Sequence, residues 1–350
     1  MATWVIPPAA LAAWAAVGHS ASIAAAIFIG ALMLGSVLIA VHHAEVVAHR
    51  LGEPFGTLVL TLSVTIIEVS LIVSMMMSGE PNPELVRDTV HAVVILVLNG
   101  VAGLCIVAGT LRHREQEFST AGASAFLTVL MPMVVLVLVL PNYTTSAPGP
   151  FYSRSQLFFV ACVCLMLYGA FLFIQTVRHK DYFLARIPAT GAPMEPTISA
   201  SSAWIAGGML IVSLLGVVLL AEALAPFIEN GIAASGAPAK LAGVIVAAIV
   251  LLPETMAALK AARDNRLQTS INLALGSAVS SIGMTIPAIG MLSLWIGQPL
   301  ALGTDAGSTV LLALSFVLAM LTYGQGRTNL LSGIVHLVLL ACYMFLIFAP

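Results

Sequence analysis

Charged residues are scarce in this 350-residue sequence, where Asp, Glu, Lys and Arg together make up 8% of the chain. Soluble domains carry roughly 25% charged residues, so this shortage excludes a water-soluble globular protein. The net charge of −2 leaves no basic surface for a nucleic acid. Cysteine is also rare, and because all four lie in apolar runs we expect them to act as small core hydrophobes: Cys105, Cys162, Cys164 and Cys342.

Hydrophobic residues make up 60% of the chain and form runs of about 20 residues, the length at which a helix crosses the hydrocarbon core. We therefore predict an all-α membrane protein with about eleven transmembrane helices. A first span, residues 3–18, is interrupted by Pro7 and Pro8 and is less regular than the others. The remaining predicted spans are residues 21–41, 54–78, 90–111, 122–140, 155–177, 203–226, 239–259, 271–297, 304–323 and 330–349.

Basic residues lie unevenly at the ends of these spans. Ten of them fall in one set of alternate loops, and the other set holds only Arg87, Arg154 and Lys240. Cytoplasmic loops are enriched in Lys and Arg, so the loops with ten basic residues face the cytoplasm. This orientation predicts a multi-pass protein of the bacterial inner membrane whose C-terminus is periplasmic.

The longest polar connection, residues 178–202, divides the chain into an extra N-terminal helix (residues 1–20), a first five-helix repeat (21–177) and a second five-helix repeat (203–350), with 178–202 as a cytoplasmic linker. Because five is odd, the second repeat enters the membrane from the opposite side. We therefore predict a 5+5 inverted-topology repeat, an arrangement that many secondary transporters share.

Two acidic residues interrupt the apolar runs at corresponding places in the two halves. Glu68 lies on the second helix of the first half and Glu254 on the second helix of the other, so we expect the helices to cross near the bilayer centre. An ionised carboxylate costs several kcal/mol in hydrocarbon, and such residues mark ion or proton pathways. A stripe of Thr57, Thr61 and Thr65 shares the helical face of Glu68, and Pro253 frees a backbone carbonyl one turn before Glu254.

Neutral polar residues follow each acid on the next helix. We predict that the cation and protons are bound by Glu68 and Glu254, the direct metal ligands, with oxygens from Thr65, Asn99, Asn272, Ser277 and Ser281. Oxygen ligands suit hard cations such as Ca²⁺. Two carboxylates balance one divalent charge or hold protons instead, because desolvation favours a protonated acid. This competition predicts a cation:proton antiporter with no resident cofactor and no enzymatic activity, which exports Ca²⁺, Na⁺ or K⁺ through the lipid bilayer in exchange for H⁺.

Three stretches carry a family resemblance: residues 50–72, 253–287 (PETMAALKAARDNRLQTSINLALGSAVSSIGMTIP) and 326–337 (GRTNLLSGIVHL). They resemble the bacterial calcium/sodium:proton antiporters of the cation/Ca²⁺ exchanger superfamily. The resemblance implies a ten-helix inverted-repeat core with an extra N-terminal helix, and acidic ligands at Glu68 and Glu254. It also implies helix-pairing positions at Asn99, Asn272, Gly276 and Ser277. The Asn of the superfamily's Gly-Asn-x-x-Glu motif is absent before both acids.

Histidines gather at the cytoplasmic end of the second span. His42, Glu45 and His49 lie at i, i+3 and i+7 on one face, next to His43. They are either polar groups of an interfacial helix end, a pH-sensing or gating cluster, or a zinc site. His336, on an apolar helix, is typical of a hydrogen-bonded core histidine.

The alternative to a carrier is a passive cation channel, which would use rings or filters of repeated carbonyl or charged groups. The sequence has no such repeat and only one mid-membrane acid in the second helix of each half. It also lacks the His-Glu-x-x-His pair of a metalloprotease and the Gly-x-x-x-x-Gly-Lys stretch of an ATP-driven protein.

Overall fold

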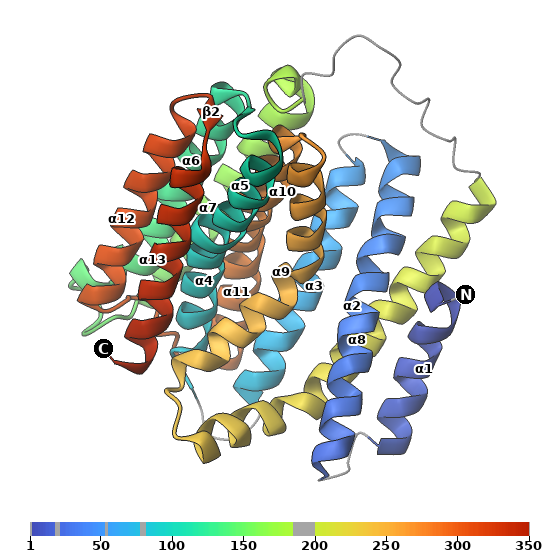
Figure 1. The fold of residues 1–350 in the computed structure, drawn as a ribbon. Coiled ribbons are helices and arrows are strands. Elements are labelled where there is room, and N and C mark those ends of the chain that lie inside the picture. The colour runs from blue at the N-terminus through green and yellow to red at the C-terminus, as the bar shows by residue number, and fades with distance from the viewer. Residues whose placement is uncertain (1, 18–21, 53–54, 78–81, 185–199, 350) are drawn as a thin grey trace. The chain divides into compact units, whose positions relative to one another are not determined.

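A computed structural model describes residues 2–17, 22–52, 55–77, 82–184 and 200–349, and these are almost entirely helical (Figure 1). The α-helices are α1 (Ala2–Val17), α2 (Ile23–Leu51), α3 (Phe55–Met77), α4 (Leu85–Ile95), α5 (Ala102–His113), α6 (Thr120–Val134), α7 (Arg154–Phe173), α8 (Ala200–Ser235), α9 (Lys240–Arg263), α10 (Leu267–Ser280), α11 (Ile286–Ile296), α12 (Ala306–Tyr323) and α13 (Leu330–Phe348).

Short irregular elements join or interrupt these helices. Four of them are π-helical turns: η1 (Leu96–Val101), η2 (Val135–Val139), η4 (Ile174–Arg178) and η6 (Ser281–Thr285). Two are 3-10 turns, η3 (Leu140–Tyr143) and η5 (Lys180–Tyr182). The strands β1 (Gln116–Glu117) and β2 (Arg327–Thr328) pair antiparallel, with Gln116 opposite Thr328.

Ten helical spans in the described part of the chain are long and apolar enough to cross a membrane. They coincide with the ten regular spans predicted from the sequence, which are confirmed. The additional N-terminal helix is also present as α1, although its apolar stretch is shorter than the other ten. Of the predicted linker 178–202, residues 185–199 lie outside the described residues.

The helices form two compact units that do not follow the order of the chain. The first unit comprises Met1–Asn82 and Gly191–Pro253, and the second comprises Pro83–Thr190 and Glu254–Pro350. Each predicted half therefore contributes its first helices to the first unit and its last three spans to the second unit. The boundary within the second half falls at Pro253, in the middle of α9.

In the first unit, α2 packs along α8 and α3, and α1 packs against α8 and α2. Buried residues recur along α2 every three or four positions, as at Ala25, Ile29 and Met33, and they form the face that packs against the other helices. At Gly216 of α8, an added Cβ would lie 2.9 Å from Cβ of Ala10, so the glycine permits the close approach of α1.

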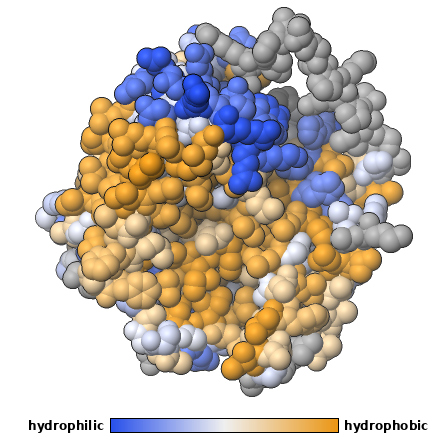
Figure 2. Space-filling view, in the orientation of Figure 1, coloured by the Kyte–Doolittle hydropathy of each residue, from blue (hydrophilic) through white to orange (hydrophobic). Residues whose placement is uncertain are grey.

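In the second unit, the continuous span α4–η1–α5 is the most buried of the ten, with 78% of its apolar window inside the protein. It contacts α13, α10 and α12, while α7 packs on α11 and α6 on α10. Figure 2 shows hydrophobic side chains covering α12 and α13 and hydrophilic side chains near β2. On these two helices, Leu314 is 47% exposed and Val338 is 53% exposed. The second unit thus has a lipid-compatible outer face, and its mainly apolar core also encloses polar residues such as Asn99 and His336.

Candidate cation-binding residues

Glu68 lies on the buried side of α3 and is 0% exposed. Thr61 and Thr65, on the same face, are also buried, whereas Leu62 and Ile66 on the opposite face are 45% and 43% exposed. The helical period accounts for this division, because residues three, four and seven positions apart share a side. The structure therefore places a carboxylate and hydroxyl groups on the side of α3 that faces protein.

Glu254 is half-buried and follows Pro253 in the interior of α9. Proline has no backbone N–H, so the carbonyl of Ile249 lacks its usual helical donor at this point. The C-terminal end of α9 is fixed within the second unit, since the carbonyl of Ala262 accepts a 2.8 Å hydrogen bond from Nε2 of Gln116.

Asn99 sits in the π-helical turn η1 and is fully buried. Its Nδ2 donates to Oγ of Ser315 on α12 at 2.7 Å, and its Oδ1 lies 3.3 Å from Nδ1 of His336 on α13. Nε2 of His336 in turn lies 3.1 Å from Oγ1 of Thr322. The prediction that His336 is a hydrogen-bonded core histidine is confirmed, and the Asn99 amide is held from both sides within the second unit.

Asn272 belongs to a different set of contacts, near the start of α10. Its Oδ1 accepts from Nε2 of Gln268 at 2.8 Å, and its Nδ2 donates to the carbonyl of Phe183. Oε1 of Gln268 accepts from the backbone N–H of Ser119, so these amides join three segments of the second unit. Along one helix, nine residues separate Asn272 from Ser281, about 13 Å. The structure therefore does not bring Asn272 together with Ser281.

Ser277 and Ser281 are both buried and lie deeper in the same span. Ser281 begins η6, the π-helical turn that interrupts the third span of the second half as η1 interrupts that of the first. π-helical turns within α-helices occur frequently at functional sites. The two turns contain Asn99 and Ser281, which are both among the predicted cation-binding residues.

The histidines of α2 divide into two groups. His42, Glu45 and His49 are exposed on one face, whereas His43 is only 4% exposed. Nε2 of His43 lies 3.1 Å from the carbonyl oxygen of Thr3 on α1. Among the described residues, no three His, Cys, Asp or Glu side chains gather as a metal-binding group, so the zinc alternative has no support.

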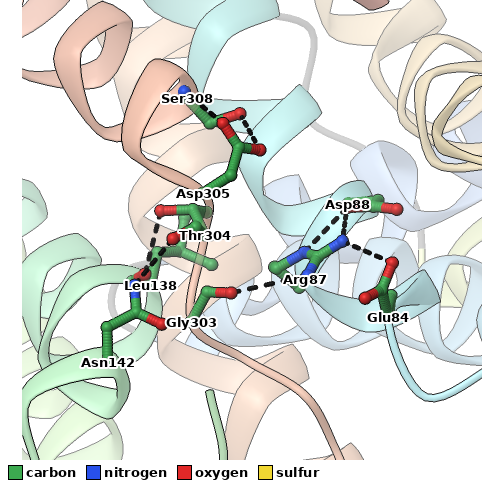
Figure 3. A network of polar contacts seen from close by, with 9 residues as sticks. All are labelled: Glu84, Arg87, Asp88, Leu138, Asn142, Gly303, Thr304, Asp305 and Ser308. Atoms are coloured by element: carbon green, nitrogen blue, oxygen red, sulfur yellow. Dashed lines mark hydrogen bonds and ion pairs between the residues drawn. The ribbon is translucent and has the colours of Figure 1, made fainter. Parts of the chain in front are cut away.

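A buried ionic network, which no pattern in the sequence indicated, lies at the start of α4. Arg87 is 6% exposed and donates to Asp88 at 2.9 Å, to Glu84 at 2.8 Å and to the carbonyl of Gly303. Figure 3 shows Arg87 between the two carboxylates, beside the chain that leads to Thr304. Charged residues at the end of a span read as interfacial in a hydropathy profile, so only the fold reveals that this arginine is buried.

The neighbouring chain before α12 is also pinned to the second unit. Thr304 donates its hydroxyl and its backbone N–H to the carbonyl of Leu138, at 3.0 and 2.8 Å, and Asn142 Nδ2 donates to the Thr304 carbonyl (Figure 3). Asp305 then caps α12 by accepting from the backbone N–H of Ser308 at 2.8 Å. This end of the second unit is therefore tied together by polar contacts among α4, η3 and α12.

Comparison with known proteins gives consistent matches along most of the chain. The family described as sodium/calcium exchanger protein matches at residues 21–177 and 205–349. Escherichia coli sodium-potassium/proton antiporter ChaA is 35% identical over 321 residues, which cover 91% of this chain and 87% of ChaA. Sinorhizobium fredii y4hA, which carries the name of an ionic transporter, is 45% identical over 320 residues, with the same coverage of 91% and 87%.

Solved structures show the same fold at lower identity. The structure of native YfkE superposes with a TM-score of 0.77 at 18% identity, covering 99% of this chain and 100% of YfkE. An H⁺/Ca²⁺ exchanger, CAX, gives a TM-score of 0.66 at 13% identity, with coverage of 93% and 85%. The predicted architecture, a 5+5 inverted-topology repeat with one N-terminal helix, is confirmed. This chain is a multi-pass membrane protein that belongs to the sodium/calcium exchanger family.

Proposed function

We propose that this chain is a secondary antiporter that exports an inorganic cation, Ca²⁺, Na⁺ or K⁺, in exchange for protons. The observation that carries the proposal is Glu68, a fully buried carboxylate on a membrane-length apolar helix. Family membership supports it, as do the names of relatives: E. coli ChaA is a sodium-potassium/proton antiporter, and a Bacillus subtilis relative is a Ca²⁺/H⁺ antiporter.

The chemistry of the proposed exchange follows from the acids. Glu68 and Glu254 hold the cation as carboxylates and hold protons as neutral acids, because a charge without a counterion is costly at membrane depth. Hydroxyl oxygens of Thr65, Ser277 and Ser281 add uncharged ligands of the kind that hard cations prefer. If the protein reorients across the membrane only when the acids are protonated or a cation is bound, the cation and the protons must move in opposite directions.

We propose a smaller part for the two asparagines. Each amide already has partners for its nitrogen and its oxygen within the second unit. An amide oxygen has two lone pairs, so each can offer at most one further acceptor position to the cation. Asn99 and Asn272 therefore contribute less to the affinity for the cation than the carboxylates do.

The test is proton flux in everted membrane vesicles after addition of Ca²⁺, Na⁺ or K⁺. We expect saturable, cation-driven proton movement for the wild type and its loss for Glu68→Gln and Glu254→Gln, which keep the shape of the side chain but not its charge. Glu222→Gln is the matched control, because Glu222 is an exposed acid on α8. Exchange at the wild-type rate in the Glu68 variant would contradict the proposal, and flux that never saturates would favour a channel.

We propose that His42 and His43 set the pH dependence of exchange from the cytoplasmic end of α2. Histidine changes charge near neutral pH, and the ring centroids of His42 and His43 lie 5.6 Å apart. Replacement of both by Ala is expected to shift the pH profile of proton flux while the half-saturating cation concentration stays the same. An unchanged profile would remove this role, and His179→Ala, in the second unit, is the control.

We further propose that the protein lies in the bacterial inner membrane with its C-terminus on the periplasmic side. The ten-to-three distribution of Lys and Arg between alternate loops supports this orientation.

A further inference from the structure

His336 belongs to a face of α13 that fits closely against η1 and α5. An added Cβ at Gly333 would lie 2.8 Å from Cγ2 of Val107, and one at Gly103 would lie 2.9 Å from the Leu337 side chain. Gly100 faces Leu340 in the same way, at 3.3 Å. Because residues 333, 336, 337 and 340 lie at i, i+3, i+4 and i+7, the glycines that bring the helices together also bring His336 against the π-helical turn.

The π-helical turn next to this histidine departs from regular helical hydrogen bonding. The N–H of Ala102, which in a regular α-helix would bond the carbonyl of Leu98, instead bonds the carbonyls of Asn99 and Val97. His336 contacts this irregular turn through Nδ1, which lies 3.3 Å from Oδ1 of Asn99. The ring therefore faces the part of the span where regular helical hydrogen bonding is interrupted.

The side chains around the ring form a directed series of hydrogen bonds. Oγ of Ser315 donates its only hydrogen to the carbonyl of Leu311 at 2.7 Å, so it can only accept from Nδ2 of Asn99. The Asn99 oxygen then faces Nδ1 of His336 and requires a hydrogen there. Nε2 is left as the acceptor for the hydroxyl of Thr322.

Reversing the Asn99 amide breaks this series. Its oxygen would then face Oγ of Ser315, which has no second hydrogen to give once Leu311 is bonded. All four side chains are at most 5% exposed, so water cannot complete an unmade bond without entering the core. The count of donors and acceptors therefore selects a neutral His336 with its hydrogen on Nδ1.

We propose that His336 is a positioning residue for exchange: as the Nδ1–H tautomer it fixes the Asn99 amide and the π-helical turn η1 against α12 and α13. It does not touch the cation. The part of this inference that concerns transport rests on the proposed function. Its structural part, the tautomer, stands on the contacts of the second unit alone.

The tautomer can be read from the ¹⁵N spectrum of imidazole-labelled full-length protein in lipid nanodiscs at neutral pH. His336→Asn identifies the His336 signals by their disappearance. We expect a hydrogen on Nδ1 and none on Nε2, the reverse of the preference of a histidine in water. A ring protonated on Nε2, alone or together with Nδ1, would overturn the inference.

Two conservative variants test the effect on transport. Asparagine places its amide near Nδ1 of the original ring and can still donate to Asn99, whereas glutamine reaches only the position of Nε2. For His336→Asn we expect the half-saturating cation concentration of proton flux to stay within about twofold of wild type, and for His336→Gln to rise on the order of tenfold. Equal values for the two variants would contradict the positioning role.

The two proposals fail in different ways. A wild-type protein without cation-driven proton flux would overturn the proposed function, and the ¹⁵N spectrum would then decide the state of His336 by itself. Normal wild-type flux combined with an Nε2–H tautomer would overturn only the role of His336.

Discussion

Single buried polar residues in the second unit are satisfied by side chains and carbonyls that are distant in sequence. Arg87 reaches Gly303, and Asn99 reaches Ser315, both across 216 positions of the chain. A polar group without a partner in such surroundings costs about 1–3 kcal/mol, more if it is charged. Each of these contacts should therefore contribute measurably to the free energy of unfolding.

Replacing Arg87 with Met should destabilise the protein by about 3–5 kcal/mol, because Asp88, only 7% exposed, would lose its cationic partner. The measurement is chemical unfolding of purified protein in detergent. Arg154→Met is the matched control, since among the described residues that exposed arginine makes a single hydrogen bond, to the backbone of Leu294. Its loss should cost about 1 kcal/mol or less. Equal losses for the two variants would contradict a buried ion pair.

Replacing Ser315 with Ala should cost about 1–3 kcal/mol, because Nδ2 of Asn99 would lose its acceptor in a buried place. Ser213→Ala provides the comparison: this buried serine donates only to the carbonyl of Met209, one turn earlier in α8. We expect that control to change the unfolding free energy by about 0.5 kcal/mol at most. A Ser315 variant as stable as the Ser213 variant would show that the Asn99 contact contributes nothing.

At the scale of helices, two irregularities are matched by histidines from neighbouring helices. Pro7 cannot donate to the carbonyl of Thr3, and His43 of α2 lies 3.1 Å from that oxygen. The turn η1 interrupts its span, and Nδ1 of His336 on α13 lies 3.3 Å from Oδ1 of Asn99 in that turn. In an apolar environment the polar groups at such irregularities need partners from another helix, so each irregularity fixes how two helices meet.

The contact of α13 with α5 depends on glycine. Gly333→Ala would place a methyl group 2.8 Å from Cγ2 and 2.9 Å from the backbone N of Val107, so we expect a loss of about 1–3 kcal/mol in unfolding free energy. At Gly169, in α7, an added Cβ meets nothing within 4 Å. Gly169→Ala should therefore be neutral or stabilising by up to about 1 kcal/mol. A destabilised Gly169 variant with an unaffected Gly333 variant would contradict this packing.

On the scale of the whole molecule, the compact units cut across the two halves of the sequence. The first unit holds α2 and α3 of one half with α8 and the start of α9 from the other, and Glu68 and Glu254 fall in different units. A chain built from two inverted halves can divide in this way because equivalent helices of each half occupy equivalent places.

The orientation can be tested with reporters fused to the full chain. Alkaline phosphatase at the C-terminus should be active, because that enzyme folds with its disulfides only outside the cytoplasm, and a fluorescent protein inserted in the 178–202 connection should fluoresce. The reverse pattern would show that the ten basic residues of the connecting loops face the periplasm and would overturn the orientation.

The sequence by itself determined the ten apolar spans, their inverted arrangement and the polar face of α3, because hydropathy and helical period are properties of one segment at a time. It also identified His336 as a core histidine. It could not identify the partners of that histidine, since Asn99 lies 237 positions away. Nor did it indicate that Arg87 is buried or that Asn272 bonds Phe183 rather than lying with Ser281.

Only the tertiary structure decided these contacts and the division into two units. A side chain's partner depends on which helices meet and on how closely glycines such as Gly103 and Gly333 let them approach. Which helices meet is decided by packing among segments that are distant in the sequence, so a local pattern along the chain cannot predict it.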